Sequence, residues 1–394
     1  MTNECCWLRW PRARLFIVVA ALLFSTLSFQ SSTYAQGSLI PPDEPGPTMK
    51  SLDQVEARTI VNATNTPGDE TNTFIISQPG SYYLTGNITG EPKKHGISIQ
   101  ANDVTLDLNG FALSSGGGGA LRGVDVPVAQ KNLSVRNGTI RGWTGGGMRA
   151  DLASNTLAEK LRLSDNTNAE GLSFGNGTAR DCVATGNGTG FILGNGAQIR
   201  DCAATANSYG FVIGERAMAT SCISTQNSFI GYEGANFVTL TDCTAGRNFG
   251  PAGIRVQGGS SVIHCDASRN IPTASGIIAG EGCTVTDCTT ASNGSIGIDA
   301  DVGSTIQNCT ANANGNNGIF TDHGVVTGCT SAHNGGSGIS NSSGSTSNCA
   351  ASFNGSNGIN TTSGVVAFCL AVLNNGSQNI NAVGSTRTGN NPGP

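Results

Sequence analysis

Short runs in which apolar and polar residues alternate recur along most of the chain. In "TGFILGNGAQIRDCAATANS", a period of two places Phe191 and Leu193 on the same, inward side, and Ile199, Cys202 and Ala204 follow. Runs this short, separated by glycine and asparagine, are typical of strands joined by tight turns, because both residues tolerate left-handed backbone angles. The pattern predicts three short strands in each repeat.

The repeat is marked by ten cysteines with spacings of 20 to 23 residues. An asparagine stands five residues after each of them, from Asn187 to Asn374, and in nine of the ten a glycine and an apolar residue follow. The same glycine–apolar pair extends back to Gly96-Ile97 in longer repeats that lack the cysteine. Leu161 and Asn166 occupy the two marked positions in the repeat before Cys182. This regularity predicts a solenoid of about thirteen coils over residues 96–380.

Three strands in a coil of about 20–24 residues cannot pair with one another locally. They pair instead with the equivalent strands one coil away, in parallel and about 4.8 Å apart. The predicted fold class is therefore all-β, a single-stranded parallel β-helix with three-strand coils. A core this narrow needs few large side chains, which agrees with 56 glycines and only 6% aromatic residues.

Two columns of side chains follow from the repeat. The asparagines share one turn position, where their amides can hydrogen-bond along the stack as a ladder. We expect them to adopt left-handed backbone angles. The cysteines form a column of small buried side chains whose Cβ atoms lie about 4.8 Å apart, further than a disulfide requires. They are expected to be reduced.

The ends of the chain differ in composition from the repeats. Three arginines precede the apolar run from Leu15 to Phe24, which predicts a signal peptide over residues 1–35. Residues 36–73 are assigned as a linker and N-terminal segment, 74–95 as an N-terminal cap, and 381–394 as a polar C-terminal tail. We expect a secreted, periplasmic or cell-surface protein, with no membrane insertion after signal removal.

Charge limits the possible partners. The chain has 21 basic and 26 acidic residues, and removing residues 1–35 takes away three basic residues and one acidic residue, which leaves a net charge of −7. A nucleic-acid partner is therefore not expected. The C-terminal end of the helix lacks an evident cover, so we expect a monomer or weak association through that end.

The repeat region resembles a known superfamily. Its "ISQPGSYYLTGN" segment followed by "GISIQANDVTLDLNG" is similar to secreted bacterial right-handed parallel β-helix proteins of the pectate-lyase-like superfamily, and the resemblance covers residues 74–380. It implies the right-handed β-helix fold. The superfamily includes polysaccharide lyases, hydrolases and epimerases as well as surface and periplasmic proteins without known chemistry, so the resemblance does not specify an activity.

Acidic residues gather on three neighbouring coils. Aligning coils on the glycine–apolar pair places Asp301 over Asp322, with Glu281 and His323 one position further and Asp299 two residues before Asp301. Neighbouring carboxylates suit glycoside hydrolysis, which makes Asp299, Asp301, Asp322 and His323 the candidate catalytic residues and Glu281 a candidate substrate-binding residue. The same carboxylates could instead hold Ca²⁺ or form a solvated acidic face. No other cofactor is predicted.

Basic residues are a second candidate. Arg180 and Arg200 occupy the same outward position in adjacent coils and could grip an acidic sugar chain, or they could form exposed ion pairs with Asp181 and Asp201. His95, like His264, is expected to be an isolated surface residue.

Two functions are compatible with these patterns. The first is a non-catalytic scaffold or binding module acting at the cell surface or on extracellular polysaccharide. The alternative is a polysaccharide-active enzyme that uses the acidic face. A glycoside hydrolase is favoured over a lyase or an epimerase, which stay open. Because coils from Gly171 onward vary little in length, any groove formed by inserted loops is expected nearer the N-terminal coils.

Overall fold

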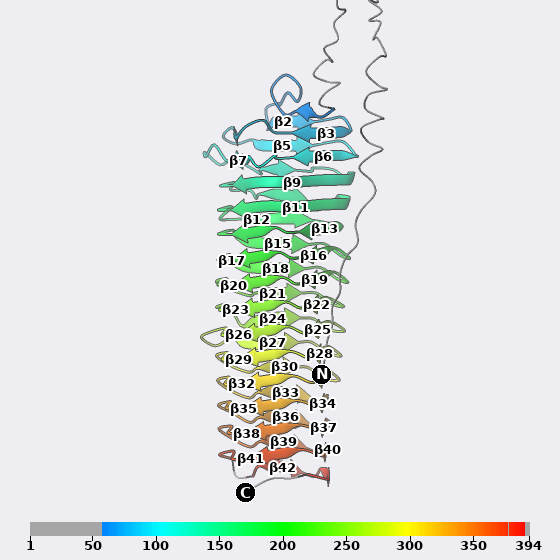
Figure 1. Cartoon of the computed structure of the whole chain (residues 1–394), viewed down its shortest axis with the longest axis vertical. Coiled ribbons are helices and arrows are strands. Elements are labelled where there is room, and N and C mark those ends of the chain that lie inside the picture. Colours follow the sequence, from blue (N-terminus) through cyan, green and yellow to red (C-terminus); the bar gives the residue numbers. More distant parts are fainter. Residues whose placement is uncertain (1–56, 377, 391–394) are drawn as a thin grey trace, which may run out of the picture. The chain divides into compact units, whose positions relative to one another are not determined.

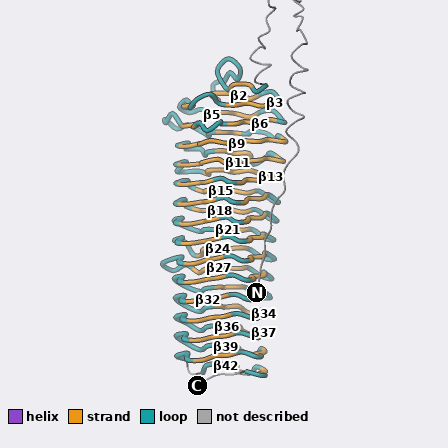
Figure 2. Tube along the Cα trace, viewed as in Figure 1, coloured by secondary structure: helices purple, strands orange, loops and turns teal. Residues whose placement is uncertain are grey.

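The computed structural model describes residues 57–376 and 378–390, which form one stack of parallel coils without a helix (Figures 1 and 2). The predicted signal peptide and residues 36–56 of the predicted linker lie outside the described residues. Each coil passes in turn through three faces of the stack, which we call face 1, face 2 and face 3. All pairing between their strands is parallel and joins one coil to the next.

Face 1 is a sheet of fifteen strands. They are β2 (Asn72–Ile76), β5 (His95–Ile99), β8 (Val124–Asp125), β10 (Met148–Ala150), β12 (Glu170–Phe174), β15 (Thr189–Leu193), β18 (Tyr209–Ile213), β21 (Tyr232–Gly234), β24 (Ala252–Val256), β27 (Ser275–Ala279), β30 (Ile298–Ala300), β33 (Ile319–Asp322), β36 (Ile339–Ser342), β39 (Ile359–Thr362) and β42 (Ile380–Val383).

Face 2 follows face 1 in each coil. Its strands are β1 (Thr59–Ile60), β3 (Gly80–Tyr83), β6 (Val104–Asp107), β9 (Lys131–Arg141), β11 (Ser154–Ser164), β13 (Gly177–Arg180), β16 (Gln198–Arg200), β19 (Met218–Thr220), β22 (Thr239–Thr241), β25 (Ser261–Ile263), β28 (Thr284–Thr286), β31 (Thr305–Gln307), β34 (Val325–Thr327), β37 (Ser345–Ser347), β40 (Val365–Ala367) and β43 (Thr386–Thr388).

Face 3 completes the coil, and the long strands β9 and β11 run through both faces and join them in one sheet of 28 strands. Its other strands are β4 (Ile88–Thr89), β7 (Ala112–Ser114), β14 (Val183–Thr185), β17 (Ala203–Thr205), β20 (Ile223–Thr225), β23 (Thr244–Gly246), β26 (Asp266–Ser268), β29 (Thr289–Ala291), β32 (Thr310–Asn312), β35 (Thr330–Ala332), β38 (Ala350–Ser352) and β41 (Leu370–Val372).

The stack extends further at both ends than residues 96–380. Residues 74–95, which the sequence suggests as a cap, belong to a coil of the same kind, because β2, β3 and β4 pair in parallel with β5, β6 and β7. Strand β43 pairs with β40 in the segment expected to be a polar tail. The repeat pattern did not predict these extra strands, because their coils lack both the cysteine and the glycine–apolar pair that mark the other coils.

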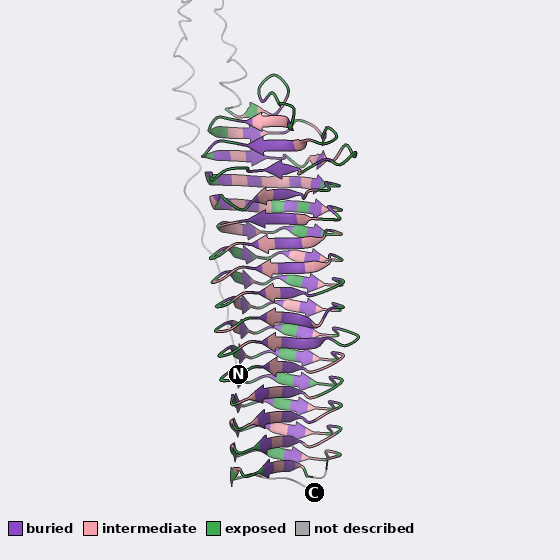
Figure 3. Ribbon diagram, turned by 180° about the vertical axis from the view of Figure 1, so that it is seen from behind, coloured by how far each residue is buried: buried purple, intermediate pink, exposed green. Residues whose placement is uncertain are grey.

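The core is a continuous column of inward side chains. Most strands bury at least every second residue, as the purple segments in Figure 3 show. Phe191 and Phe211 stack with ring centroids 5.0 Å apart, and Tyr232 continues the stack at 4.8 Å. The Tyr232 hydroxyl donates a hydrogen bond to the Cys222 carbonyl oxygen at 2.6 Å, so its polar atom is satisfied within the core. In-register strands thus bring like side chains into contact from coil to coil.

The predicted asparagine ladder is present between faces 3 and 1. Eleven asparagines from Asn166 to Asn374 each donate from Nδ2 to the Oδ1 atom of the next asparagine along the stack, at 2.8–3.2 Å, and the last of these acceptors is Asn379. At the other end, the backbone N–H of Trp143 donates to Asn166 Oδ1 at 2.9 Å. Asn187 Nδ2 also donates to the Leu163 carbonyl oxygen at 2.9 Å. The ladder therefore satisfies buried backbone groups as well as its own amides.

The expected left-handed angle falls on a different residue. The residue before the ladder asparagine has positive φ, for example Ala313 at 55° and Leu373 at 54°, whereas the ladder asparagines do not. The prediction for the asparagines was wrong because their side chains must point inward to reach both the next amide and a core-side carbonyl. The chain reverses direction one residue earlier.

The cysteine column lies between faces 2 and 3. Eleven cysteines in the described part of the chain, the off-column Cys283 included, are free thiols and buried. The Cys182 N–H donates to Cys202 Sγ at 3.4 Å, and the Cys202 thiol donates to the Arg200 carbonyl oxygen at 3.2 Å. Burial raises the pKa of the Cys283 thiol. The predicted stack of small, buried side chains is confirmed, and the reduced state of its thiols stays a prediction.

We expect Asn314→Ala to destabilise the helix by roughly 2–4 kcal/mol. The substitution removes the acceptor for Asn293 and two donated hydrogen bonds, to the Thr290 carbonyl oxygen and to Asn334, all of them buried. Urea denaturation and hydrogen exchange of the neighbouring coils measure the effect. Asn374→Ala should cost less because Asn374 is half-exposed. The control Ala313→Gly should be neutral or stabilising, since it relieves a left-handed angle. If both alanine variants, at Asn314 and at Asn374, lost the same free energy of unfolding, burial of the ladder asparagine would not determine its contribution to stability.

We expect none of these eleven cysteines to react with iodoacetamide in the folded chain beginning at Gln36. Reaction requires an accessible thiolate, and burial opposes both access and ionisation. Mass spectrometry after labelling should find every one of them modified once the chain is unfolded in guanidinium. Modification of Cys202 or Cys309 under native conditions would show that the column opens locally.

Candidate functional site

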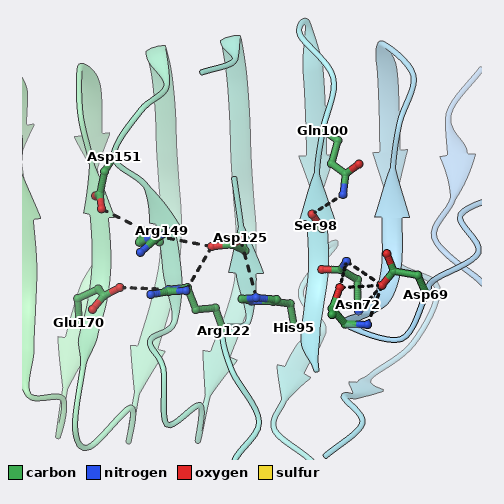
Figure 4. Close-up of polar contacts among 11 residues, drawn as sticks. Asp69, Asn72, His95, Ser98, Gln100, Arg122, Asp125, Arg149, Asp151 and Glu170 are labelled. Atoms are coloured by element: carbon green, nitrogen blue, oxygen red, sulfur yellow. Dashed lines mark hydrogen bonds and ion pairs between the residues drawn. The ribbon is translucent and has the colours of Figure 1, made fainter. Parts of the chain in front are cut away.

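Charged side chains gather on the outer side of face 1 in the N-terminal coils (Figure 4). At their centre is Asp125 on β8, which is only 5% exposed. His95 lies on β5, Arg122 just before β8 and Arg149 on β10, and all three point toward the Asp125 carboxylate (Figure 4). With Asp151 and Glu170, which pair with the two arginines, we call these residues the face-1 cluster.

Strand register creates this cluster. Ser98, Asp125, Arg149 and Ser173 are aligned on successive strands of face 1. Because strands in register lie about 4.8 Å apart, these outward side chains are immediate neighbours. The inward neighbours Val124 and Met148 are fully buried in the core, which holds the backbone that carries Asp125 and Arg149.

The contacts within the cluster neutralise charge but leave hydrogen bonds unmade. Arg122 Nη1 and Arg149 Nε lie 3.6 and 3.7 Å from Asp125 Oδ1, and His95 Nε2 lies 3.9 Å from Asp125 Oδ2. These distances exceed those of a hydrogen bond, about 2.7–3.2 Å. The buried atoms His95 Nδ1, Arg122 Nε and Asp125 Oδ1 have no hydrogen-bond partner among the described residues. The cluster therefore contains buried hydrogen-bond donors and a buried acceptor that are not satisfied.

His95 is in an environment that favours its neutral form. Burial lowers the pKa of the His95 imidazole from 6.5; the Asp125 carboxylate opposes this shift, and Arg122 and Arg149 add to it. A neutral imidazole has one ring nitrogen that donates and one that accepts. At neutral pH the cluster therefore offers His95 as a polar but uncharged group.

A hollow of about 350 Å³ adjoins the cluster. Arg122, Arg149 and Glu170 line one side, and Ile192 and Gly194 of the following coil line the other. Gly194 is required there, because a Cβ atom would lie 2.2 Å from the Gly175 carbonyl oxygen. The hollow combines charged hydrogen-bonding groups with an aliphatic surface.

The chain matches a family model described as right handed beta helix region over residues 72–231 and 228–375, which together span most of its length. The chain belongs to this right-handed β-helix family. No curated protein matches it in sequence.

The chain also shows weak likenesses to solved structures. The A-module of a mannuronan C-5 epimerase from Azotobacter vinelandii is 16% identical, with a TM-score of 0.38, over 79% of this chain and 90% of that one. Tailspike protein 3 of bacteriophage CBA120 is 10% identical, with a TM-score of 0.42, over 86% of this chain and 57% of that one. The surface protein and adhesin PfbA of Streptococcus pneumoniae is 9% identical, with a TM-score of 0.20, over 80% and 89%. These likenesses concern the fold alone.

The predicted acidic residues lie elsewhere on this right-handed β-helix. Ala300 pairs with Thr321, so the next residues, Asp301 and Asp322, are in register as the alignment predicted. Asp322 Oδ1 contacts His323 Nδ1 at 2.9 Å, and both side chains are exposed. Glu281 is exposed in the turn after β27.

Asp299 differs from the other acidic residues in its surroundings. It is half-buried between Ile278 and Phe320 in the outward column of face 1. Burial, followed by the charge of Asp301, raises the pKa of the Asp299 carboxyl. The catalytic roles assigned to Asp299, Asp301, Asp322 and His323 stay predictions.

The predicted basic pair is in register but already engaged. Arg180 and Arg200 are aligned on β13 and β16. Arg180 Nη2 contacts Glu159 Oε1 of the preceding coil at 3.0 Å, and Arg200 Nη1 lies 3.8 Å from Asp201 Oδ2. The partner of Arg180 is thus Glu159, not Asp181, because Glu159 is its in-register neighbour on β11. Substrate binding by Arg180, Arg200 and Glu281 stays a prediction.

Sequence reasoning missed the face-1 cluster. His95 was expected to be isolated on the surface, but its side chain is 13% exposed and lies beside Asp125. A usable signal existed, since Asp125 and Arg149 each follow the glycine–apolar pair directly. Within the described ranges, no group of three or more His, Cys, Asp or Glu side chains is arranged to hold a metal ion, and no helix is long and apolar enough to cross a membrane.

We expect Asp299→Asn to stabilise the helix at neutral pH but not in acid. A carboxyl whose pKa is raised in the folded state binds its proton more tightly there, so stability falls as the pH rises from 3.8 through the folded-state pKa. Asparagine removes this loss. Urea midpoints at about pH 3.5 and pH 7 measure it, with Asp266→Asn, an exposed carboxylate on β26, as the control. If both variants gained the same stability at neutral pH, burial of Asp299 would not be the cause of the gain.

Proposed function

We propose that this protein is a secreted polysaccharide-binding β-helix that holds a sugar chain in the hollow beside the face-1 cluster. The observation that carries the proposal is the set of buried, unpartnered hydrogen-bonding atoms at Asp125, Arg122 and His95. A buried polar atom without a partner destabilises a protein by about 1–3 kcal/mol, more for a charged group. Arg122 lines the hollow, and Asp125 and His95 adjoin it through their contacts within the cluster, so these groups are well placed to bind a ligand.

The combination of donor and acceptor selects the ligand. Asp125 Oδ1 needs a donor, whereas Arg122 Nε needs an acceptor. A sugar hydroxyl supplies both, while a free anion supplies acceptors only. Arg122 and Arg149 are already balanced by Asp125, Asp151 and Glu170, so the cluster does not call for a negative charge. We therefore expect neutral sugar units at this site.

The shape of the site also suits a chain. A hollow of about 350 Å³ lies within the range of small-molecule sites, roughly 300–1,000 Å³. Its lining residues come from successive coils, so a linear ligand can lie along the stack. Ile192 provides an aliphatic surface for the faces of sugar rings. Secretion is supported by the basic residues Arg9, Arg12 and Arg14 ahead of an apolar run.

Glycoside hydrolysis at the acidic face is a second candidate. Burial raises the pKa of the Asp299 carboxyl, which is the direction that a general acid requires, and the Asp301 carboxylate beside it adds to this shift and is a candidate second carboxyl. New reducing ends released from a bound polysaccharide, and lost in Asp299→Asn, would support catalysis.

We expect Arg149→Gln to weaken sugar binding about tenfold or more, because hydrogen bonds to charged groups contribute about 1.5–3 kcal/mol each. Oligosaccharides of xylan, mannan, cellulose and chitin are screened first on an array, and the affinity of those that bind is then measured by calorimetry.

Arg255→Gln is the matched control. Arg255 occupies the same outward column of face 1, but it is hydrogen-bonded to Glu233 at 2.8 and 2.9 Å and lies away from the hollow. Binding should survive this change. If none of these neutral oligosaccharides binds the unaltered protein, or if both variants bind equally well, the face-1 site is refuted.

A further inference from the structure

We propose a second ligand site, independent of the face-1 cluster: a cationic groove on face 3 that binds an anionic glycan chain. The groove has a volume of about 520 Å³ and lies over β20, β23, β26 and β29. Gly246 forms part of its floor, and Arg247 and Arg269 stand at its rim. None of these residues belongs to the acidic or basic positions singled out in the sequence.

The groove exists because one side chain is missing from a column. Thr225, Gly246 and Ser268 are aligned on successive strands of face 3. A Cβ atom on Gly246 would meet only the Ser268 carbonyl oxygen at 3.6 Å and Thr225 Cγ2 at 3.7 Å, which are ordinary contacts. The φ angle of Gly246 is not in the left-handed region. Neither backbone conformation nor packing therefore requires glycine here, and its effect is to open the surface.

The two arginines are held in place without a counter-charge. Arg247 and Arg269 occupy the same turn position in adjacent coils, with φ of 57° and 60°. Their backbone N–H groups donate to the carbonyl oxygens of Ser268 and Ala291, which anchors both turns. Within the described part of the chain neither guanidinium has an ion pair, in contrast to Arg122, Arg180 and Arg255. The two positive charges are exposed and available.

These features select the ligand. Guanidinium groups bind carboxylates and sulfates through paired hydrogen bonds, and arginines one coil apart, about 4.8 Å, can engage anionic groups repeated along a chain. The hydroxyls of Thr244, Ser268 and Thr289 line the groove between them and suit sugar hydroxyls. Among the described residues that line it, Asp266 carries the one negative charge, so the groove stays cationic on an acidic protein. It contains no aromatic side chain on which a nucleic-acid base could stack.

The test measures binding of three oligosaccharide probes to the chain beginning at Gln36 by calorimetry at low salt. The probes are oligogalacturonate, which is carboxylated, a heparin oligosaccharide, which is sulfated, and neutral xylan oligosaccharide. The unaltered protein should bind at least one anionic probe, and binding should weaken as added NaCl screens the charges. The anionic probe that binds more tightly identifies the oxyanion.

Two groove variants separate charge from space. The double variant Arg247→Gln/Arg269→Gln should bind the anionic probe at least about tenfold more weakly. It should fold normally, because Gln226 occupies the same turn position at φ 57°. Gly246→Thr keeps both charges but fills the groove with the residue found at Thr225, and it should lose binding to a similar extent. A thermal melt verifies that both variants are folded.

Two control variants test whether the anionic probe binds in this groove. Arg216→Gln removes an arginine that also has a φ of 57° but pairs with Glu215 outside the groove, so it should not change the affinity. Arg149→Gln should also bind the anionic probe normally, which separates this groove from the face-1 cluster. The proposal is overturned if neither anionic probe binds the unaltered protein, if the groove variants bind as tightly as it does, or if a single-stranded DNA binds equally well and is lost in the same variants.

Discussion

Hydrogen bonding between coils is the constraint on which the rest of the structure depends. In the described coils, no strand pairs with another strand of its own coil; β15, β16 and β17 each pair with the equivalent strands of the coils before and after. A coil alone would leave its backbone groups without partners, so each is stabilised by its neighbours. The asparagine ladder extends this principle to side chains, because each buried amide is satisfied only when the next coil is in place.

Register has a direct consequence for chemistry. Strands that are aligned from coil to coil turn every outward position into a column, and a column of like residues makes a uniform surface. The residues that follow one another in a column decide where a site can form. On face 1, Asp125 is followed by Arg149, and the two lie between serines. On face 3, Gly246 lies between Thr225 and Ser268. Both candidate sites therefore arise from single residues within the coils and require no inserted domain.

The repeat made the fold and the ladders predictable from the sequence. Cysteine and asparagine recur at fixed spacing, so their positions in space follow from counting, and Leu161 and Asn166 could be assigned in a coil that lacks the cysteine. The face-1 cluster could not be obtained by counting. The coils around it differ in length, and Arg122 lies in the turn before β8, where its contact with Glu170 two coils away depends on the path of that turn. Burial of His95 likewise depends on these irregular coils.

The left-handed turns were also misplaced in the sequence, for a reason that bears on function. Among the described residues, thirty-one that are not glycine adopt positive φ. Ala313, Phe353 and Leu373 are among them, although such residues disfavour this conformation. Composition alone therefore did not mark them. The inter-coil hydrogen bonds and the buried ladder impose the turn whatever residue occupies it.

Because that turn residue points away from the core, it is free to vary in charge and size, as Gln226, Arg247, Arg269 and Ser292 show in four successive coils. The fold requires the asparagine at the ladder position. The turn residue that precedes the asparagine is not constrained in this way and can take a functional role. The rim of the cationic groove is built from this unconstrained position, so its arginines can be replaced without disturbing the stack that presents them.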